Sequence, residues 1–312
     1  MKFGFYTDTH YTLRCEARTD DTLASFLAKT KEAFEFFVSS GCEFVIFGGD
    51  MFDRHRELNF ELLRRVWEVY NSFPLPVYFI MGNHDENGYR WQTIDKSNIG
   101  FLASLMKERL IFIEDSLELP GCIIYAHHAG QDLNKRQSAI VKSDKPVILV
   151  SHCLLADNRN IGNIHINEIT NRNIDLVLSG DLHDGYSMQI NKSGITCYNS
   201  GSLGRMSRHD TDRKPKVAVF NFEYLMDSWT TCIREKELTI ESGEMVFVNK
   251  AVDVPEVEKD IKDGTETYIH VFRKFKGESR DIFDALHRVG IETGIDAAVL
   301  SLIDSYKDRQ NI

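Results

Sequence analysis

Short runs of apolar residues alternate with longer amphipathic stretches through the first half of the chain. Five apolar runs have the length and continuous hydrophobicity of buried strands: residues 3–7, 43–47, 77–81, 146–150 and 175–178. Between them, residues 22–39 and 60–72 place apolar side chains at helical spacing. This alternation predicts a layered α/β fold in which helices cover the faces of a sheet.

The second half of the chain is richer in strand-like pattern. Further strands are expected at residues 187–190, 195–199, 217–222, 228–234 and 245–252. The tail then changes, with a strand expected at 265–272 and helices at 280–289 and 297–306. Because residues 253–264 are charged and weakly periodic, we place a boundary within 238–264. The pattern thus predicts a main domain of residues 1–238 and a small α+β domain of residues 239–312.

The composition is that of a soluble globular protein, since 42% of the 312 residues are hydrophobic and 27% are charged. The longest apolar runs are far shorter than the roughly 20 residues that cross a membrane. The N-terminus enters a strand pattern at once, without the apolar region and cleavage site of a signal peptide. We therefore expect a cytoplasmic protein with no membrane association.

The six cysteines are widely separated and form no C-x-x-C pair. This spacing fits neither a zinc cage nor a disulfide framework in a chain of this size. We expect buried free thiols.

The net charge of −10, from 37 basic and 47 acidic residues, gives no support to nucleic-acid binding, which usually leaves a basic footprint. It does not exclude such binding either. Carboxylates that bind metal ions count as negative in this total, yet bound divalent cations reverse the local sign where a phosphate would lie.

Each of the five strand-like runs ends in residues of the types that bind metal ions. In chain order these are Asp8 and His10, Asp50, Asn83 with His84, His152, and Asp181 with His183. In α/β sheets, ligands gather at the carboxyl ends of strands, so five such ends can converge on one crevice. Residues two apart in an extended segment point to the same side, so the first pair can act together, and the last pair likewise.

Carboxylate, imidazole and amide oxygen suit Mn, Fe or Zn better than the metals that thiolates select. A carboxylate such as Asp50 can bridge two ions. Two ions about 3.5–4 Å apart activate a water and stabilise both ends of an in-line displacement at phosphorus. Any one of these short motifs alone is weak, but all five in this order indicate a site for phosphoester hydrolysis.

The set of motifs resembles that of the calcineurin-like metallophosphoesterases: D-x-H, G-D-x-x-D, G-N-H-D/E, a lone histidine and G-H-x-H. The resemblance covers residues 1–222. It implies a four-layer α/β sandwich of two mixed sheets flanked by helices. With the expected tail, the fold class is this metallophosphoesterase sandwich with a small C-terminal α+β capping domain.

The resemblance also implies roles for the motif residues. One metal ion would take Asp8, His10, Asp50 and His183, and the second would take Asp50, Asn83, His152 and the residue at position 181. His84 would protonate the leaving oxygen or stabilise the developing charge, which suits the titration range of histidine.

Asp181 departs from the family pattern, which has a histidine at this position. An aspartate can still bind a divalent ion, and its negative charge favours harder ions such as Mn²⁺. The substitution puts the affinity for the second metal ion in question. A degenerate site is therefore kept as an alternative.

Two further stretches resemble SbcD-type DNA repair nucleases. Residues 49–56 resemble that group's version of the second motif, and residues 198–207 resemble its proline-glycine-serine turn followed by an arginine and a serine. The expected C-terminal unit corresponds to the DNA-capping domain of those enzymes. The resemblance implies a nuclease of DNA repair and recombination that acts on DNA ends or hairpins, usually with two Mn²⁺ ions and an SMC-like ATPase partner.

Basic residues just beyond the site loops are candidates for binding DNA phosphates, foremost Arg54, His55 and Arg205. Arg56, Arg208, Lys214 and Lys216 share this setting, and Arg273, Lys274 and Lys276 form a second cluster in the expected cap. Solvated surface charge is the alternative for all of them. His127 and His128 follow a strand-like run, where an ordinary loop pair is favoured over extra metal ligands.

Only about two helices are expected after residue 272, whereas the family uses a linker and further helices to engage the ATPase. The partner therefore docks elsewhere on this chain or is absent. Enzymes of this type commonly form homodimers, although no sequence feature identifies an interface.

Two other functions remain open. A small-molecule phosphodiesterase or phosphatase on the same scaffold fits the acidic balance of the chain. A non-catalytic scaffold subunit with a degenerate metal site fits the aspartate at position 181.

Overall fold

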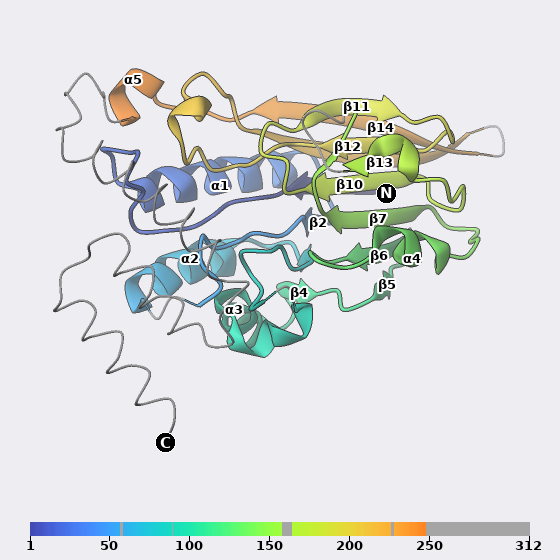
Figure 1. Ribbon diagram of the computed structural model, residues 1–312, viewed down its shortest axis with the longest axis horizontal. Coiled ribbons are helices and arrows are strands. Elements are labelled where there is room, and N and C mark those ends of the chain that lie inside the picture. Colours follow the sequence, from blue (N-terminus) through green and yellow to red (C-terminus); the bar gives the residue numbers. More distant parts are fainter. Residues whose placement is uncertain (57–58, 89, 158–163, 226–227, 248–312) are drawn as a thin grey trace, which may run out of the picture. The chain divides into compact units, whose positions relative to one another are not determined.

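Two six-stranded mixed sheets face each other in the structure, with helices on their outer sides (Figure 1). This computed structural model describes residues 1–56, 59–88, 90–157, 164–225 and 228–247. The first sheet has the order β14-β13-β1-β2-β3-β4. Its strands are β1 (Lys2–Tyr6), β2 (Phe44–Phe47), β3 (Val77–Phe79), β4 (Leu110–Phe112), β13 (Lys216–Leu225) and β14 (Ser228–Glu237). Strands β1 to β4 are parallel, and the β13–β14 hairpin adds to β1 in antiparallel register.

The second sheet has the order β11-β12-β10-β7-β6-β5. Its strands are β5 (Ser116–Glu118), β6 (Ile123–His127), β7 (Val147–His152), β10 (Leu176–Gly180), β11 (Tyr186–Ile190) and β12 (Thr196–Asn199). The four central strands are parallel, and β5 and β11 are antiparallel edges. A separate two-stranded ladder pairs β8 (Leu155–Ala156) with β9 (Ile164–His165).

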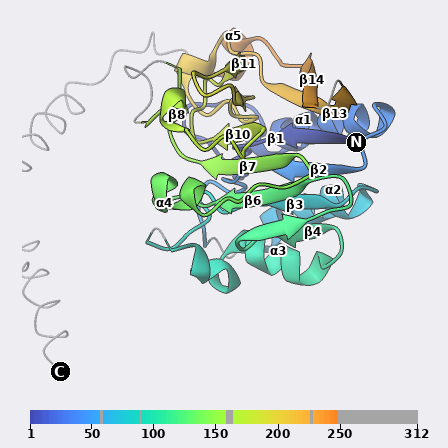
Figure 2. The same cartoon turned by 90° about the vertical axis from the view of Figure 1, so that its right-hand side faces the viewer.

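The two sheets lie against each other (Figure 2), and side chains on their inner faces form one apolar core. On β7 the alternation of a strand is visible, because Ile148 and Val150 point into this core. Val147 and Leu149, between and beside them, belong to a separate cluster on the outer side of the second sheet. Burying each such side chain contributes roughly 1.5–3 kcal/mol, so this continuous core holds the two sheets together.

The helices complete the outer layers. They are α1 (Thr22–Ser39), α2 (Phe60–Ser72), α3 (Asn98–Met106), α4 (Leu133–Ser138) and α5 (Gly243–Val246). Among the described residues, short 3-10 helices accompany them at Trp91–Lys96, Ile166–Glu168 and Arg208–Asp210. Side chains of α1, α2 and α3 pack on the outer face of the first sheet, and α4 packs on that of the second. The expected four-layer sandwich of two mixed sheets flanked by helices is confirmed.

Helices α1 and α2 begin and end where their apolar spacing predicts. Asp21 caps α1 by accepting a hydrogen bond from the Ala24 amide at 2.9 Å, and Asn59 caps α2 through the Leu62 amide at 3.1 Å. Such caps satisfy amides that have no partner within the helix. Each helix therefore starts at a short polar residue that directly precedes its apolar face.

The strand expected at 245–252 is wrong where the structure describes it. Residues 243–246 form the short helix α5 instead. Val246 and Phe247 are both buried, although neighbouring side chains on a strand would point to opposite sides. Phe247 lies under the guanidinium groups of Arg18 and Arg205, and these contacts decide the local conformation.

Residues 239–247 continue along the main unit, which extends to Val248. The Thr239 amide donates to the Glu32 carboxylate at 2.8 Å, and the Thr19 amide donates to the Val246 carbonyl at 2.8 Å. The elements expected at 265–272, 280–289 and 297–306, with Arg273, Lys274 and Lys276, lie outside the described residues. The capping domain of residues 239–312 stays a prediction.

All six cysteines are free, as the sequence suggests. Cys42, Cys122 and Cys197 are buried, whereas Cys232 is exposed on β14. Across the residues that the structure describes, no helix is both long and apolar enough to cross a membrane.

A group of buried cations joins α1 to the segment after β12. The side chains of Arg18, Lys29 and Arg205 are all nearly inaccessible to solvent. Arg18 pairs with Asp20 at 2.6 Å, and the Lys29 ammonium donates to the hydroxyl and carbonyl oxygens of Ser25 at 2.9 and 3.2 Å. Burial, together with the charges of Arg18 and Arg205, lowers the pKa of Lys29 to about 7.

This pKa predicts how stability depends on pH. A lysine in the unfolded chain titrates near 10.4, so between about pH 7 and pH 10 the unfolded chain holds a proton that the folded chain lacks. The contribution of Lys29 to stability is therefore lowest below pH 7 and improves as pH rises through that window. Lys29→Met removes the buried charge and two hydrogen bonds, and we expect a net gain of about 2 kcal/mol in the free energy of unfolding at pH 7.

Urea unfolding of the wild type and Lys29→Met at pH 7 and pH 10 measures this gain, which should vanish at the higher pH. Lys31→Met, at an exposed position of the same helix, is the matched control and should change stability at neither pH. A variant that is less stable than the wild type at pH 7 would show that Lys29 is charged and well solvated.

Candidate metal centre

Loops from both sheets meet at the carboxyl ends of their parallel strands. In the first sheet, Asp8 and His10 follow β1, Asp50 follows β2, and Asn83 follows β3. In the second sheet, His152 ends β7, and both Asp181 and His183 follow β10. The close approach of the sheets requires Gly180, because a Cβ atom there would collide with the Thr7 hydroxyl. Side chains from the two sheets are thereby brought within reach of one another.

Four of the residues in these loops have a backbone conformation that side chains disfavour. The φ angle is +53° at Asp8, +47° at His10, +58° at Asp50 and +74° at Asp181. Elsewhere in the described chain, Lys107 is the one further non-glycine residue with positive φ. Each such residue costs on the order of 1 kcal/mol and persists only where its surroundings hold it, as at functional sites.

Hydrogen bonds hold these turns in place. The amide of Asp8 donates to the Gly49 carbonyl at 3.0 Å, and that of His10 donates to the Asp50 carbonyl at 3.1 Å. The Asp181 amide donates to both carboxylate oxygens of Asp8 at 3.2 Å, which links the two sheets. These backbone hydrogen bonds thus hold the ligand loops of the two sheets together.

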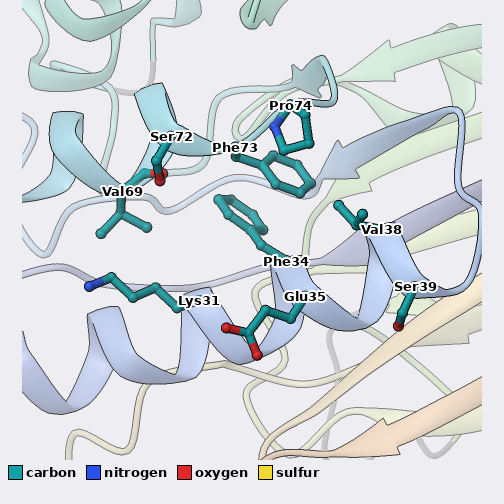
Figure 3. Close-up of a pocket in the computed structure, with 9 residues that line it drawn as sticks. All are labelled: Lys31, Phe34, Glu35, Val38, Ser39, Val69, Ser72, Phe73 and Pro74. Carbon is teal, nitrogen blue, oxygen red and sulfur yellow. The ribbon is translucent and has the colours of Figure 1, made fainter.

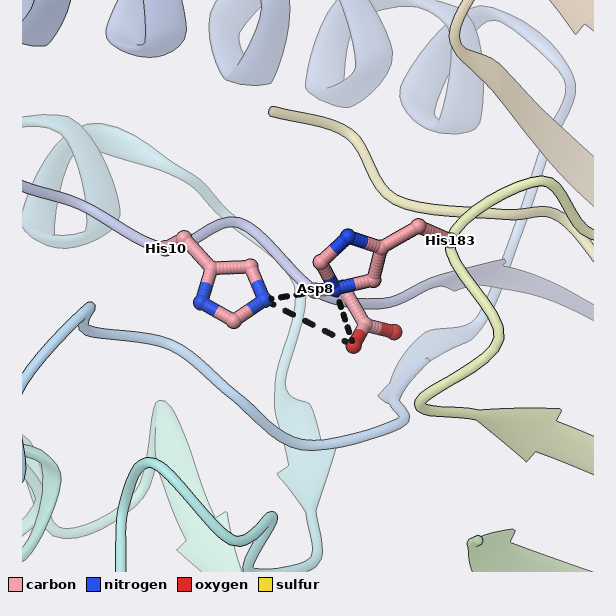
Figure 4. A group of neighbouring side chains, drawn as sticks. All are labelled: Asp8, His10 and His183. Atoms are coloured by element: carbon pink, nitrogen blue, oxygen red, sulfur yellow. Dashed lines mark hydrogen bonds and ion pairs between the residues drawn. The ribbon is translucent and has the colours of Figure 1, made fainter. Parts of the chain in front are cut away.

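A first group of metal-binding types consists of Asp8, His10 and His183 (Figure 4). The Nε2 atoms of the two histidines are 3.1 Å apart, and each lies 3.8 Å from Oδ1 of Asp8. Ligand nitrogens about 2.0–2.1 Å from one ion are separated by about 3 Å. The two imidazoles therefore stand at the separation expected of ligands to one cation.

A second group consists of Asp8, Asp50 and His152. The Nε2 atom of His152 is 3.3 Å from the Asp50 carboxylate and 3.1 Å from the amide oxygen of Asn83. Its Nδ1 atom is 2.7 Å from the Gly48 carbonyl and donates to it, so the Nε2 lone pair faces the group. Asp8 belongs to both groups, which makes the two positions adjacent.

Carboxylates and imidazoles in the centre shift one another's pKa. Burial lowers the pKa of His152, but the Asp50 carboxylate, with Asp8 and Asp181, outweighs burial and raises it well above its usual range. Burial likewise raises the pKa of Asp50, but His152 and His10 outweigh it and hold it well below the usual value. The carboxylates that raise the pKa of His152 carry the negative charge that divalent cations would neutralise.

His84 stands beside the first group. Its ring centroid is 4.7 Å from that of His10, and its Nδ1 atom donates to the Asp53 carbonyl at 2.7 Å. Its backbone amide donates to Oδ1 of Asp50 at 2.8 Å. The ring is thus oriented through Nδ1, and Nε2 remains free to exchange a proton with a reacting group.

Two carboxylates were not singled out from the sequence. Asp53 forms a third group of metal-binding types with His10 and His84. Asp85, the fourth residue of Gly-Asn-His-Asp, is buried and accepts hydrogen bonds from the amides of Asp50, Met51 and Gly82 at 2.7, 3.0 and 3.1 Å. Burial and the charge of Asp50 raise the pKa of Asp85 to about 7. The hydrogen bonds of Asp85 thus connect the loop after β3 to the loop after β2.

The three residues expected to bind substrate differ in their exposure to solvent. Arg54 is exposed and His55 is half-buried, in the loop after β2. Arg205 is completely buried, and its guanidinium donates to the carbonyls of Thr211 and Glu241. The expectation that Arg205 contacts a DNA phosphate is corrected, because it fastens its own loop to the segment that leads to α5.

His127 and His128 are buried outside the metal groups of the described residues. His127 bonds to the Ser151 hydroxyl at 2.7 Å, and His128 accepts from the Met81 amide at 3.1 Å. Burial lowers the pKa of each to about 4, so both are neutral hydrogen-bonding groups.

A surface hollow of about 470 Å³ lies between α1 and α2 (Figure 3). Stacked rings of Phe34 and Phe73, with centroids 3.8 Å apart, form its floor, and Lys31 and Glu35 line it. None of its lining residues belongs to the metal groups.

Asp85→Asn tests the link between the two ligand loops. The amide has one acceptor oxygen in place of two, and its NH₂ group would face backbone donors. We expect a loss of about 2–4 kcal/mol in the free energy of unfolding and a 10- to 100-fold loss of metal affinity.

Thermal unfolding and calorimetric titration with Mn²⁺ measure the two effects. Asp184→Asn, which changes an exposed carboxylate next to His183, is the control and should alter neither. Unchanged metal affinity in Asp85→Asn would mean that Asp50 needs no such support.

Comparison with known proteins agrees with this geometry. A model of the family described as calcineurin-like phosphoesterase matches residues 1–185. The uncharacterized metallophosphoesterase YhaO of Bacillus subtilis (strain 168) is 26% identical over 128 residues, which are 40% of this chain and 31% of that protein. The match thus spans about a third of that relative's length.

A solved structure also shares the fold. A dimetal phosphatase from Danio rerio superposes with a TM-score of 0.50 at 13% identity, covering 70% of this chain and 91% of that one. At this identity the likeness shows the fold alone.

Proposed function

This chain belongs to the calcineurin-like phosphoesterase family, and from that premise we propose that it is a two-metal nuclease that hydrolyses the phosphodiester bonds of DNA. Membership of the family implies the general activity, which is metal-dependent hydrolysis of phosphoester bonds. The observation that carries the proposal is the pair of adjacent ligand groups that share Asp8.

The residues of the centre fit a divalent cation in each group. Asp8, His10 and His183 would hold one ion, and Asp50, Asn83 and His152 would hold the other. When bound, such ions supply Lewis acidity at phosphorus and lower the pKa of a bound water. Oxygen and imidazole donors suit Mn²⁺, which we propose as the ion used.

The side chains of the chain itself orient the substrate and move a proton. His84, held through Nδ1 on the Asp53 carbonyl, can give a proton from Nε2 to the leaving oxygen. The amide of the same residue orients Asp50. Arg54, exposed beyond Asp53, can bind a phosphate oxygen of the same strand of DNA.

A second group of donors favours a polymeric substrate. A pocket of about 200 Å³ follows the His183 loop, and Asn199, Ser200, Lys214 and Lys216 line it. The amide nitrogen of Asn199 is buried there without a hydrogen-bond partner among the described residues. Because β12 is parallel to β10, its end lies one strand beyond Asp181, where a neighbouring DNA phosphate could bind.

We also propose that the enzyme acts in DNA repair or recombination, with an SMC-like ATPase partner and as a homodimer. The motifs at residues 49–56 and 198–207 support this part of the proposal.

His84→Ala tests the nuclease. With Mn²⁺, we expect the wild type to cleave linear or hairpin DNA and the variant to be slower by about 10²- to 10⁴-fold, because general acid catalysis is lost. Gel analysis of labelled DNA measures both rates, and His209→Ala, at an exposed position, is the control.

A small-molecule phosphodiesterase is the second candidate, favoured by the net charge of −10. Turnover of bis(p-nitrophenyl) phosphate without cleavage of any DNA would support it and refute the nuclease. A chain that binds no metal ion would indicate a scaffold subunit.

Replacing Lys214 and Lys216 together by alanine tests the pocket after β12. Each cation that contacts a phosphate adds about 0.7–0.9 to the slope of log affinity against log salt. We expect DNA affinity to fall and the slope to decrease by about 1–2, with hydrolysis of the small diester unchanged. The double variant Lys135→Ala/Lys142→Ala, at exposed positions, is the control, and an unchanged slope in the first variant would exclude the pocket from DNA binding.

A further inference from the structure

We propose that His10, Asp53 and His84 form a third, weaker cation position, and that Zn²⁺ bound there inhibits the enzyme by occupying the His84 nitrogen that carries the proton. The inference rests on the proposed two-metal function and concerns the regulation of that site. The existence of the position can be tested without substrate.

The three residues lie close enough to share one ion. Each offers one ligand atom, and these atoms all lie within 4.8 Å of one another. Ligand atoms that are about 2.0–2.2 Å from one ion can be up to about 4 Å apart, so small movements of the side chains would close the group. Two imidazoles and one carboxylate, with a water in the fourth place, are a donor set that zinc sites use.

His84 has the hydrogen-bond pattern of a metal-binding histidine. Its Nδ1 atom donates to the Asp53 carbonyl at 2.7 Å. Because a carbonyl can only accept, the neutral ring carries its proton on Nδ1 and a lone pair on Nε2. Histidines that bind metal ions almost always donate from their other nitrogen in this way, and His152 does so to the Gly48 carbonyl at 2.7 Å. The Nε2 atom of His84 is therefore as well prepared for a cation as that of His152.

The carboxylate of Asp53 has no competing partner among the described residues, since no hydrogen bond or ion pair engages its oxygens. The backbone amide of Asp53 donates to the Tyr11 carbonyl at 3.3 Å, which holds the main chain in place. Asp53 and His84 are both half-buried, so an ion can reach them from solvent. A half-buried carboxylate that no protein donor binds is available to a cation.

The third position should bind its ion more weakly than the other two positions do. His10 already belongs to the first group, where its Nε2 atom is 3.1 Å from that of His183. Asp53 and His84 are thus the ligands that the third position does not share. Repulsion from the two neighbouring cations lowers its affinity further. It would therefore fill only when Zn²⁺ is in excess over the two ions of the centre.

An ion at this position would prevent proton transfer. His84 is proposed to give its proton from Nε2, and a bound cation takes the lone pair of that nitrogen. Loss of general acid catalysis lowers a rate by about 10²- to 10⁴-fold. Saturating Zn²⁺ should therefore slow the wild type to about the rate of His84→Ala, and that variant should lose little further activity.

The first test counts ions on the full chain without substrate. Metal-free protein is titrated with Zn²⁺ by calorimetry, and equilibrium dialysis with elemental analysis gives the number of ions bound. We expect two tightly bound ions and a third that binds at least about 10-fold more weakly. Crystals soaked in excess Zn²⁺ should show an anomalous-scattering peak between His10, Asp53 and His84.

Two variants each alter one of the unshared ligands. Asp53→Asn and His84→Gln should weaken binding of the third ion by about 10- to 100-fold. Both should keep the two tightly bound ions, and this retention shows that the variants are folded. Asp212→Asn, which changes an exposed carboxylate, is the matched control and should bind all three ions like the wild type.

The second test follows cleavage of labelled DNA in saturating Mn²⁺ while Zn²⁺ is added. Each rate is compared with that of the same protein without Zn²⁺. The wild type and Asp212→Asn should slow by at least about 10-fold, because general acid catalysis is lost, and Asp53→Asn should slow much less. Equal slowing of all three would indicate exchange of ions at the two main positions and would refute inhibition through His84.

Binding of only two ions by the wild type would overturn the third position. So would a third ion that Asp53→Asn holds with unchanged affinity, because that ion would lie elsewhere. The nuclease fails separately: three ions in the expected pattern without cleavage of any DNA would support the position and refute the nuclease, whereas cleavage with only two ions bound would do the reverse.

Discussion

The contact between the two sheets at the carboxyl ends of their strands is the constraint on which the site depends. Thr7 after β1 lies against Gly180 at the end of β10, and the Nδ1 atom of His152 donates to the Gly48 carbonyl at 2.7 Å. A Cβ atom at Gly49, whose φ is +100°, would lie 2.7 Å from that nitrogen. Neither sheet alone supplies a full set of ligands, so the apolar core between them also sets the spacing of the metal positions.

The same contact concentrates charge and strain. Asp8 and Asp50 are almost wholly buried within the reach of three histidines, and both have positive φ. Buried carboxylates are costly unless they are paired or bind cations. Asp8 accepts hydrogen bonds from the Asp181 amide and the Thr7 hydroxyl. Asp50 accepts one from the His84 amide at Oδ1, and its Oδ2 atom faces His10 and His152. The fold thus fixes an arrangement whose stability improves when cations bind, since ions that bind only the folded chain stabilise it.

Much of this arrangement could be predicted because strand ends and ligand types coincide in the sequence. Helices α1 and α2 could also be located, since each has a clear apolar stripe behind a short polar cap. The sequence pattern does not predict the strands β4 and β5, because each has only three residues and its pairing with neighbouring strands, not its own pattern, determines its conformation. Sequence periodicity carries no information about such pairing.

The buried arginines show a second limit. The sequence suggests that Arg205 is a surface cation, yet it is completely buried against Phe247 and the backbone carbonyls of Thr211 and Glu241. The sequence likewise suggests that Asp85 is an ordinary loop residue, although three backbone amides donate hydrogen bonds to it. In both cases the partners are main-chain groups, which every residue carries, so composition and spacing cannot identify them.

An acidic chain can still act on an anionic substrate, because net charge and local charge are separate quantities. Carboxylates of the centre contribute to the total of −10, but two divalent cations would reverse the sign of the potential where phosphorus must lie. What then attracts a long polyanion is the distribution of cations around the centre. Arg54 lies in the loop after β2 of the first sheet, and Lys214 and Lys216 line the pocket after β10 of the second, so positive groups accompany the ligand loops of both sheets. A monoester would use only the centre itself, whereas a diester chain can contact the centre and the flanking cations together, and this difference is the reason why we propose a nucleic acid as substrate.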